Sequence, residues 1–194
     1  GGAVDAWKWE AQIAVAMITG CEFRNNTAAQ GGAVWAGWGA TATLTRSLFV
    51  GNTALPAGEY TEGYGGALYQ AGYDAPVGIT NCTFFGNDAQ GGTGGAVYHE
   101  GFVTIENSIL WGNTPDEVYS DGEVTATVNF SDVQGGWEGA GNISLDPMFV
   151  DGDFHLSVGS PCINAGAGEV ANDPDGSPPD LGAFYFDLTG YVWG

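Results

Sequence analysis

Basic residues are almost missing from this chain. Its 194 residues include only three of them, Lys8, Arg24 and Arg46, against 23 Asp and Glu residues, and the formal net charge is −20. A nucleic-acid-binding protein needs a basic surface to neutralise phosphates, so this charge balance excludes that function. An anionic membrane surface would repel the chain for the same reason.

Long apolar stretches and closely spaced cysteines are missing as well. No apolar run reaches the roughly 18 residues of a membrane-spanning helix, so the sequence predicts no transmembrane segment. The three cysteines, Cys21, Cys82 and Cys162, are odd in number and widely spaced. This pattern argues against a disulfide framework and against a metal site. We expect small buried thiols.

The rest of the composition is that of a folded chain. Hydrophobic residues make up 44% and aromatic residues 13% of the sequence, whereas disordered acidic chains are poor in both. The 34 glycines indicate a structure with many tight turns. The length is that of one ordinary domain, and we expect a single domain over residues 1–194.

Two short motifs recur in a fixed order. Gly-Gly-Ala followed by an aliphatic residue begins at residues 1, 31, 65 and 94. A small residue followed by x-[Phe/Leu]-x-x-Asn occurs after each of them, at residues 21–26, 47–52, 82–87 and 108–113. Helical spacing of apolar residues is absent, and the segments between the glycines are short and rich in Val, Ile, Thr and aromatic residues, as β-strands are.

Short strands that recur about every 30 residues predict an all-β parallel β-helix. Each repeat forms one coil, and successive coils stack about 4.8 Å apart through hydrogen bonds along the axis. We expect a single-stranded, right-handed solenoid of about five to six coils. Regular coils would cover residues 1–122, irregular final coils residues 123–158, and a C-terminal cap and tail residues 159–194.

Stacked coils place equivalent residues of successive repeats in columns. Two interior columns are expected, one of Val4, Val34, Leu68 and Val97 and one of Phe23, Phe49, Phe84 and Leu110. A third column, of Asn26, Asn52, Asn87 and Asn113, predicts a structural asparagine ladder at a turn. Stacked Asn amides bond to one another along such an axis, and Asn tolerates turn geometry.

The two motifs resemble the repeat of chlamydial polymorphic outer membrane proteins and of related secreted, right-handed parallel β-helix proteins. Residues 107–113, 130–136, 146–149, 159–166 and 180–183 are similar to the closing segment of large secreted β-helix proteins. This resemblance implies an extracellular or cell-surface location after removal of a signal peptide. It does not select an activity, because such proteins include adhesins, passenger domains and polysaccharide enzymes.

Catalysis is the least supported of these activities. The resemblance implies that a polysaccharide lyase would use calcium and a basic residue, yet Arg24 and Arg46 have no acidic cluster at neighbouring positions, and His99 and His155 are isolated. Hydrolysis would need paired carboxylates on adjacent strands, and the repeat columns carry almost no acid. We predict no catalytic residue. A calcium-dependent polysaccharide lyase is kept as a second alternative.

No cofactor is required, but a structural calcium ion is one interpretation of the C-terminal acids. Asp173, Asp175 and Asp180 supply oxygen ligands on turns around a glycine. Their spacing is not that of an EF-hand loop, and a solvated acidic cap is the other interpretation. Glycan attachment is also open, because Asn142 and Asn25 lie in acceptor sequons, with Asn142 preferred for its Gly-rich loop.

Outward-facing aromatic residues are the strongest surface signal. Trp35, Tyr69 and Tyr98 each follow the aliphatic column directly, so we expect them to point outward and to stack, with Trp111 at another outward position. Exposed aromatic groups mark interaction sites. Local packing of loops over the coils is the alternative interpretation. A cell-surface glycan would be the partner if these residues bind.

The ends of the solenoid suggest self-association. The motif at Gly1, Gly2 and Val4 starts within a coil, and Tyr191 and Trp193 lie in an apolar tail. An open stack end that meets the other end of a second molecule makes a contact that propagates into filaments. The first hypothesis is therefore a non-catalytic extracellular protomer that assembles head-to-tail into a fibre or surface layer. The alternative is an adhesin or glycan-binding module from a longer secreted protein.

Overall fold

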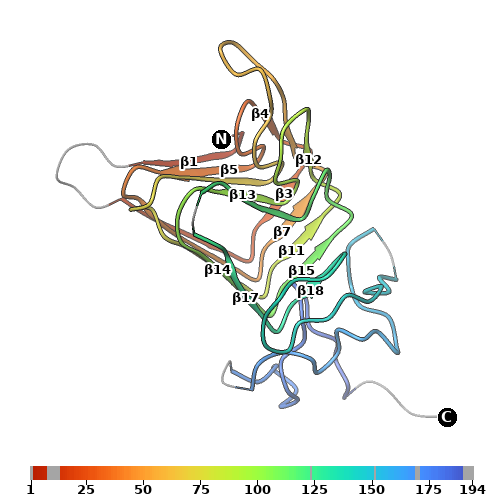
Figure 1. The fold of residues 1–194 in the computed structure, drawn as a ribbon. Helices are drawn as coiled ribbons and strands as arrows, with labels where there is room; N and C mark the ends of the chain where they lie inside the picture. The colour runs from red at the N-terminus through yellow and green to blue at the C-terminus, as the bar shows by residue number, and fades with distance from the viewer. Residues whose placement is uncertain (1, 8–13, 123, 151, 169–170, 190–194) are drawn as a thin grey trace.

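The computed structural model describes residues 2–7, 14–122, 124–150, 152–168 and 171–189, and within them it contains strands and no helix. The strands form three five-stranded sheets and a smaller one, and all strand pairs are parallel. Each coil contributes one strand to each main sheet, so the chain winds as a parallel β-helix (Figure 1). The fold class predicted from the repeats is confirmed. No described segment is a helix long and apolar enough to cross a membrane.

Successive coils supply the strands of each sheet. The first sheet consists of β1 (Val4–Trp7), β5 (Val34–Gly37), β9 (Leu68–Ala71), β13 (Val97–His99) and β16 (Val118–Ser120). The second consists of β2 (Val15–Thr19), β6 (Thr41–Thr45), β10 (Val77–Thr80), β14 (Val103–Glu106) and β17 (Thr127–Asn129). The third consists of β3 (Glu22–Arg24), β7 (Leu48–Val50), β11 (Thr83–Phe85), β15 (Ile109–Trp111) and β18 (Asp132–Val133). The short fourth sheet consists of β4 (Thr27–Ala28), β8 (Thr53–Ala54) and β12 (Asp88–Ala89).

Both interior columns lie in register. The aliphatic column pairs Val4 with Val34, Val34 with Leu68, and Leu68 with Val97, and it continues to Val118. In the aromatic column the rings of Phe23, Phe49 and Phe84 lie nearly parallel, with centroids 4.9 and 4.5 Å apart. These columns form the central core.

The Gly-Gly-Ala motif has two different steric causes. The first glycine of each described pair has a positive φ, for example 66° at Gly65, which side-chain-bearing residues rarely adopt. The second glycine lies against the next coil. At Gly66, an added Cβ would overlap the carbonyl oxygen of Gly95. Glycine is therefore required at both positions, by conformation in one case and by space in the other.

The asparagine column forms a continuous hydrogen-bonded ladder. The side-chain amide nitrogen of each Asn donates to the Oδ1 of the next, at 2.9 Å from Asn26 to Asn52, 2.9 Å from Asn52 to Asn87 and 2.7 Å from Asn87 to Asn113. Each Oδ1 also accepts the backbone N–H of the preceding ladder residue, at 3.1, 2.9 and 2.8 Å. The ladder thus satisfies both backbone and side-chain groups at this corner.

A carboxyl group ends the ladder. Glu117 accepts the backbone N–H of Asn113 at 3.2 Å and also the side-chain amide of Asn113. Glu117 is 8% exposed. Burial raises the pKa of its carboxyl from 4.5 to about 7, although the hydrogen bonds from Asn113 act in the opposite direction.

This buried carboxyl makes stability depend on pH. The folded protein holds the Glu117 proton more tightly than the unfolded chain does, so its contribution is complete below about pH 4.5 and is lost as the pH rises through about 7. We expect Glu117→Gln, which mimics the protonated group, to flatten the fall in unfolding free energy between these values by up to about 3 kcal/mol. Urea unfolding across this pH range measures the difference. Glu59→Gln, at an exposed carboxyl, is the control, and an unchanged slope in Glu117→Gln would contradict the assignment.

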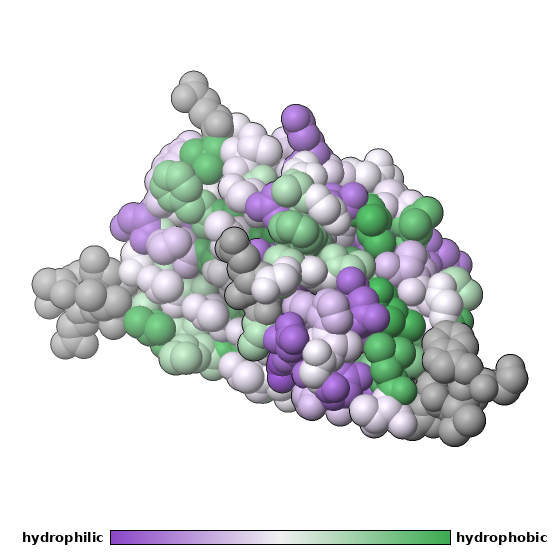
Figure 2. All heavy atoms as spheres, turned by 90° about the horizontal axis from the view of Figure 1, so that it is seen from below, coloured by the Kyte–Doolittle hydropathy of each residue, from purple (hydrophilic) through white to green (hydrophobic). Residues whose placement is uncertain are grey.

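The C-terminal segment lies beside the solenoid. Leu156, Cys162 and Leu181 pack on Ile109, on the outer side of the third sheet, and the backbone N–H of Ala183 donates to the hydroxyl of Thr83 at 3.0 Å. In Figure 1 this segment lies outside the coils, next to β15 and β18. Seen from below the view of Figure 1, the molecular surface mixes hydrophobic and hydrophilic residues (Figure 2).

The described part of residues 159–194, where we expected a C-terminal cap and tail, packs along the flank of the third sheet. It covers the flank because the outer face of β15 carries apolar side chains that need burial. Trp137, from the preceding irregular segment, packs against the central core instead. Of the thiols, Cys82 and Cys162 are buried, but Cys21 is exposed, and all three are free.

Candidate functional site

An aromatic ladder runs along the outer face of the first sheet. Strand register places Trp35 beside Tyr69, Tyr69 beside Tyr98, and Tyr98 beside Tyr119. The rings stack with centroid separations of 6.4, 4.9 and 5.6 Å and with interplanar angles below 20°. The first three members are those predicted from the sequence. Tyr119 lies in a coil without the Gly-Gly-Ala motif, so the sequence repeat does not point to it.

Each inner tyrosine donates its hydroxyl to a carboxylate from the following coil. Tyr69 donates to Glu100 and Tyr98 to Asp121, both at 2.6 Å. Burial, together with these hydrogen bonds, raises the pKa of both phenols far above the usual value. The two acids were not predicted as partners of the ladder.

The ladder residues were expected to point outward as exposed interaction groups or to be covered by local packing, and two of them are buried. Tyr69 is 7% and Tyr98 6% exposed, because each is covered by its neighbours in the stack and by the acids beside it. Trp35 is half-buried. Trp111 is not part of the ladder, since it packs on the flanking C-terminal segment beside Ile109.

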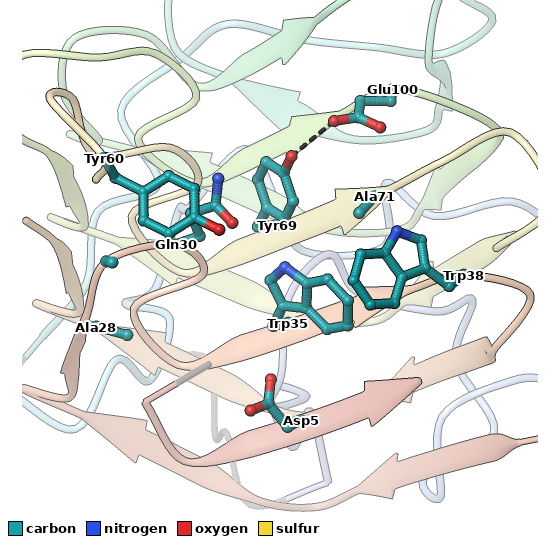
Figure 3. Close-up of a pocket in the computed structure, with 10 residues that line it drawn as sticks. Asp5, Ala28, Gln30, Trp35, Trp38, Tyr60, Tyr69, Ala71 and Glu100 are labelled. Atoms are coloured by element: carbon teal, nitrogen blue, oxygen red, sulfur yellow. Dashed lines mark hydrogen bonds between the residues drawn. The ribbon is translucent and has the colours of Figure 1, made fainter. Parts of the chain in front are cut away.

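A groove of about 600 Å³ opens at the Trp35 end of the ladder (Figure 3). It is lined by Asp5 on β1, Ala28 on β4, Ala29, Gln30, Trp35 on β5, Trp38, Tyr60, Tyr69 and Ala71 on β9, and Glu100. Trp38 and Tyr60 come from irregular segments and are 62% and 41% exposed. The ring of Trp38 stands edge-on to Trp35, with centroids 5.4 Å apart and planes at 85°.

The groove combines flat rings with acidic and amide groups. Its two acids are Asp5 and Glu100, and no Lys, Arg or His stands among the described residues that line it. Both oxygens of Glu100 are occupied: one accepts the Tyr69 hydroxyl and the other the backbone N–H of Gly72, at 2.7 Å. Such a surface can stack a ring and exchange hydrogen bonds, and its charge disfavours anions.

The three predicted calcium ligands accept hydrogen bonds from backbone N–H groups. Asp180 accepts the N–H groups of Asn164 and Phe186, at 2.6 and 2.5 Å, and Asp173 accepts that of Asp180 at 2.8 Å. Asp175 accepts the Ser177 backbone N–H at 2.9 Å. Within the described residues, no three acidic, His or Cys side chains are grouped so as to hold a metal ion.

The basic and histidine side chains are distributed over the molecule. Arg24 lies 2.9 Å from Glu22 and 3.8 Å from Asp153 on the flank of the third sheet. His99, expected to be isolated, instead contacts the Ser120 hydroxyl and the Gly101 carbonyl oxygen, both at 2.7 Å. A serine–histidine pair is a nucleophile arrangement, but His99 is 0% exposed, and burial lowers its pKa. His99 therefore lies inside the coil, and neither member of the pair lines the groove.

The preferred glycan acceptor is engaged in the fold. The Asn142 side-chain nitrogen, to which a glycan would be attached, donates to the carbonyl oxygens of Val128 at 2.9 Å and Trp137 at 3.2 Å. Its oxygen accepts the backbone N–H of Ser131 at 3.0 Å. Asn25, the other sequon residue, is exposed, whereas Asn142 is half-buried.

The predicted assembly ends are only partly described. Gly1, Tyr191 and Trp193 lie outside the described residues. Gly2 donates its N–H to the carbonyl of Gly31 at 3.1 Å, and Val4 pairs with Val34, so both belong to a stacked coil.

The fold and these columns define a parallel β-helix built from Gly-Gly-Ala and FxxN repeats, and known proteins share the repeat. Residues 20–37 match the family model of the Chlamydia polymorphic membrane protein repeat. A probable autotransporter, YfaL, from Escherichia coli strain K12 is 37% identical over an alignment of 95 residues, and the match covers 45% of this chain and 7% of the E. coli protein. No solved structure matches. The resemblance inferred from the motifs is confirmed at the level of the repeat.

Proposed function

We propose that this chain is a stretch of a secreted, surface-displayed passenger β-helix that attaches to other surfaces without catalysis. The observation that carries the proposal is the regular stack of polymorphic-membrane-protein-like coils, together with the likeness to an autotransporter. A rigid solenoid suits display, because each coil buries its core against its neighbours and leaves loops free for contacts.

Attachment is favoured over catalysis by the chemistry of the surface. The groove at the Trp35 end of the ladder is lined by aromatic side chains, while His99 of the Ser120–His99 pair is fully buried in the coil. Aromatic groups dominate the energy of protein interfaces because they bury large flat areas. An adhesin role thus fits the described residues better than a calcium-dependent lyase.

Head-to-tail self-assembly is a second candidate. Among the described residues, strands β1, β2, β3 and β4 pair with a neighbour on one side only. An edge strand is a template for a further strand, which either another coil of a longer protein or a second copy of this chain would supply.

The proposed attachment is tested with beads. Latex beads coated with the purified chain are expected to adhere saturably to cultured epithelial cells, while beads coated with the heat-unfolded chain are not. Absence of adhesion would overturn the adhesin role. Sedimentation of the same preparation examines the second candidate: a particle mass that rises with concentration supports assembly, and a constant monomer mass rejects it.

A further inference from the structure

The aromatic ladder has a gap at its first position. Strand register pairs Asp5 with Trp35, so the place where the next ring would stack belongs to a short carboxylate. Tyr69 covers one face of Trp35, and the other face looks toward Asp5 across the groove (Figure 3). The ladder therefore ends in a slot shaped for one ring, lined by protein on several sides.

The side walls of the slot come from irregular segments. Trp38 stands perpendicular to Trp35, and Tyr60 and Gln30 lie on the opposite side in Figure 3. The groove volume of about 600 Å³ falls within the range of small-molecule sites. The groove thus has room for a sugar ring at the slot and for a neighbouring ring.

We propose that this groove binds an uncharged saccharide, with one pyranose ring stacked on Trp35 in the place of the missing ladder ring. The inference rests on the proposed attachment function and names the ligand of that site. A pyranose presents a flat face of C–H bonds with slight positive charge, which complements the negative face of an indole ring. Asp5 pairs in register with Trp35 and lines the same groove, so its carboxylate lies beside the place proposed for the ring.

The polar groups match hydroxyls better than ions. Gln30 has both a donor and an acceptor, and Tyr60 has a hydroxyl that can do either, as a hydroxyl-rich ligand requires. Acidic sugars are disfavoured, because two carboxylates and no basic group line the described part of the groove. The formal net charge of the whole chain, −20, acts in the same direction. Cations are a weaker match, because both Glu100 oxygens already accept internal hydrogen bonds.

Tryptophan fluorescence and calorimetry with defined oligosaccharides test the proposal. The probes are cellohexaose, mannohexaose and chitohexaose, with hexagalacturonate as the acidic counterpart and choline as the cation. Saturable binding of at least one neutral probe is expected, with none of hexagalacturonate. Binding of choline or hexagalacturonate alone, or of no probe, would overturn the proposal.

Two variants locate the ligand. Trp35→Ala is expected to weaken binding about tenfold or more, as loss of an aromatic anchor does. Asp5→Tyr should continue the ladder, fill the slot and abolish binding while the melting temperature stays the same or rises. Tyr119→Ala, at the far end of the same ladder, is the matched control and should bind as the wild type does. Equal binding by wild type and Asp5→Tyr would place the ligand elsewhere.

The bead assay separates this proposal from the attachment function. If beads coated with the wild type adhere to cells and beads coated with Asp5→Tyr adhere equally well, the proposed saccharide site is not the site of attachment, while the attachment function stands. If a neutral oligosaccharide binds at Trp35 but no cell adheres, the site is right and the attachment function fails.

Discussion

Phe84→Ala is expected to lower the unfolding free energy by about 3–5 kcal/mol. Phe84 is fully buried, and its ring stacks on Phe49 at 4.5 Å with an interplanar angle of 4°. Strand β11, which carries it, pairs with β7 on one side and β15 on the other. These strands are held at fixed spacing by the ladder of hydrogen bonds, so the coil cannot collapse into the cavity, and most of the lost contact energy stays lost.

Equilibrium unfolding in urea, followed by circular dichroism, measures this loss. Phe102→Ala is the matched control, because Phe102 is 58% exposed and its replacement should change the free energy by less than about 0.5 kcal/mol. Similar losses in the two variants would show that the aromatic column does not carry the core.

The regular coils were predictable because their causes are local and repeat. A positive φ at the first glycine and close backbone approach at the second recur at residues 31–32, 65–66 and 94–95, so they leave the same letters in the sequence. The asparagine ladder is also visible in the sequence, because the same amide-to-amide hydrogen bond joins each ladder residue to the next. A period in the sequence then gives the register directly.

The coil after Asn113 was harder to predict, because it uses other residues for the same places. Val118 continues the aliphatic column opposite Val97, and the backbone carbonyl of Glu117 accepts from Ala96 and Val97, yet no Gly-Gly-Ala motif marks the segment. Glu117 takes the place of an asparagine at the ladder's end by reaching back to Asn113. Val118 and Glu117 take these places because of their position in the coil, and their residue types do not reveal this in the sequence.

The groove was only half predictable for a related reason. Alternation along a strand places Trp35 and Tyr69 on the outer face, and this much the sequence predicts. Whether an outward side chain is exposed depends on the coil above it, and here Glu100 from that coil covers Tyr69. Tyr60 reaches the groove from an insertion of irregular structure, whose path no repeat specifies.

Asn87→Ala is the second change with a large expected effect, a loss of about 3 kcal/mol or more in unfolding free energy. The Asn87 oxygen accepts two hydrogen bonds from Asn52, each 2.9 Å long. Its nitrogen donates to the Phe49 carbonyl at 3.0 Å and to Asn113 at 2.7 Å. Alanine leaves these groups buried without partners, and the cost of each unsatisfied group exceeds the modest net value of a hydrogen bond that is simply absent.

Asn26→Ala separates the ladder's two contributions. Asn26 is half-buried at the end of the column, and it donates to Asn52 through both its backbone and its side chain. Only the side-chain bond is removed, and water can reach the site, so the expected loss is about 1 kcal/mol. Urea unfolding of both variants gives the comparison. A loss at Asn26 as large as that at Asn87 would mean that the stacking of the amides, and not their burial, sets the stabilisation. The expected smaller loss at Asn26 would instead assign the stabilising energy of the ladder to buried groups that have no other partner.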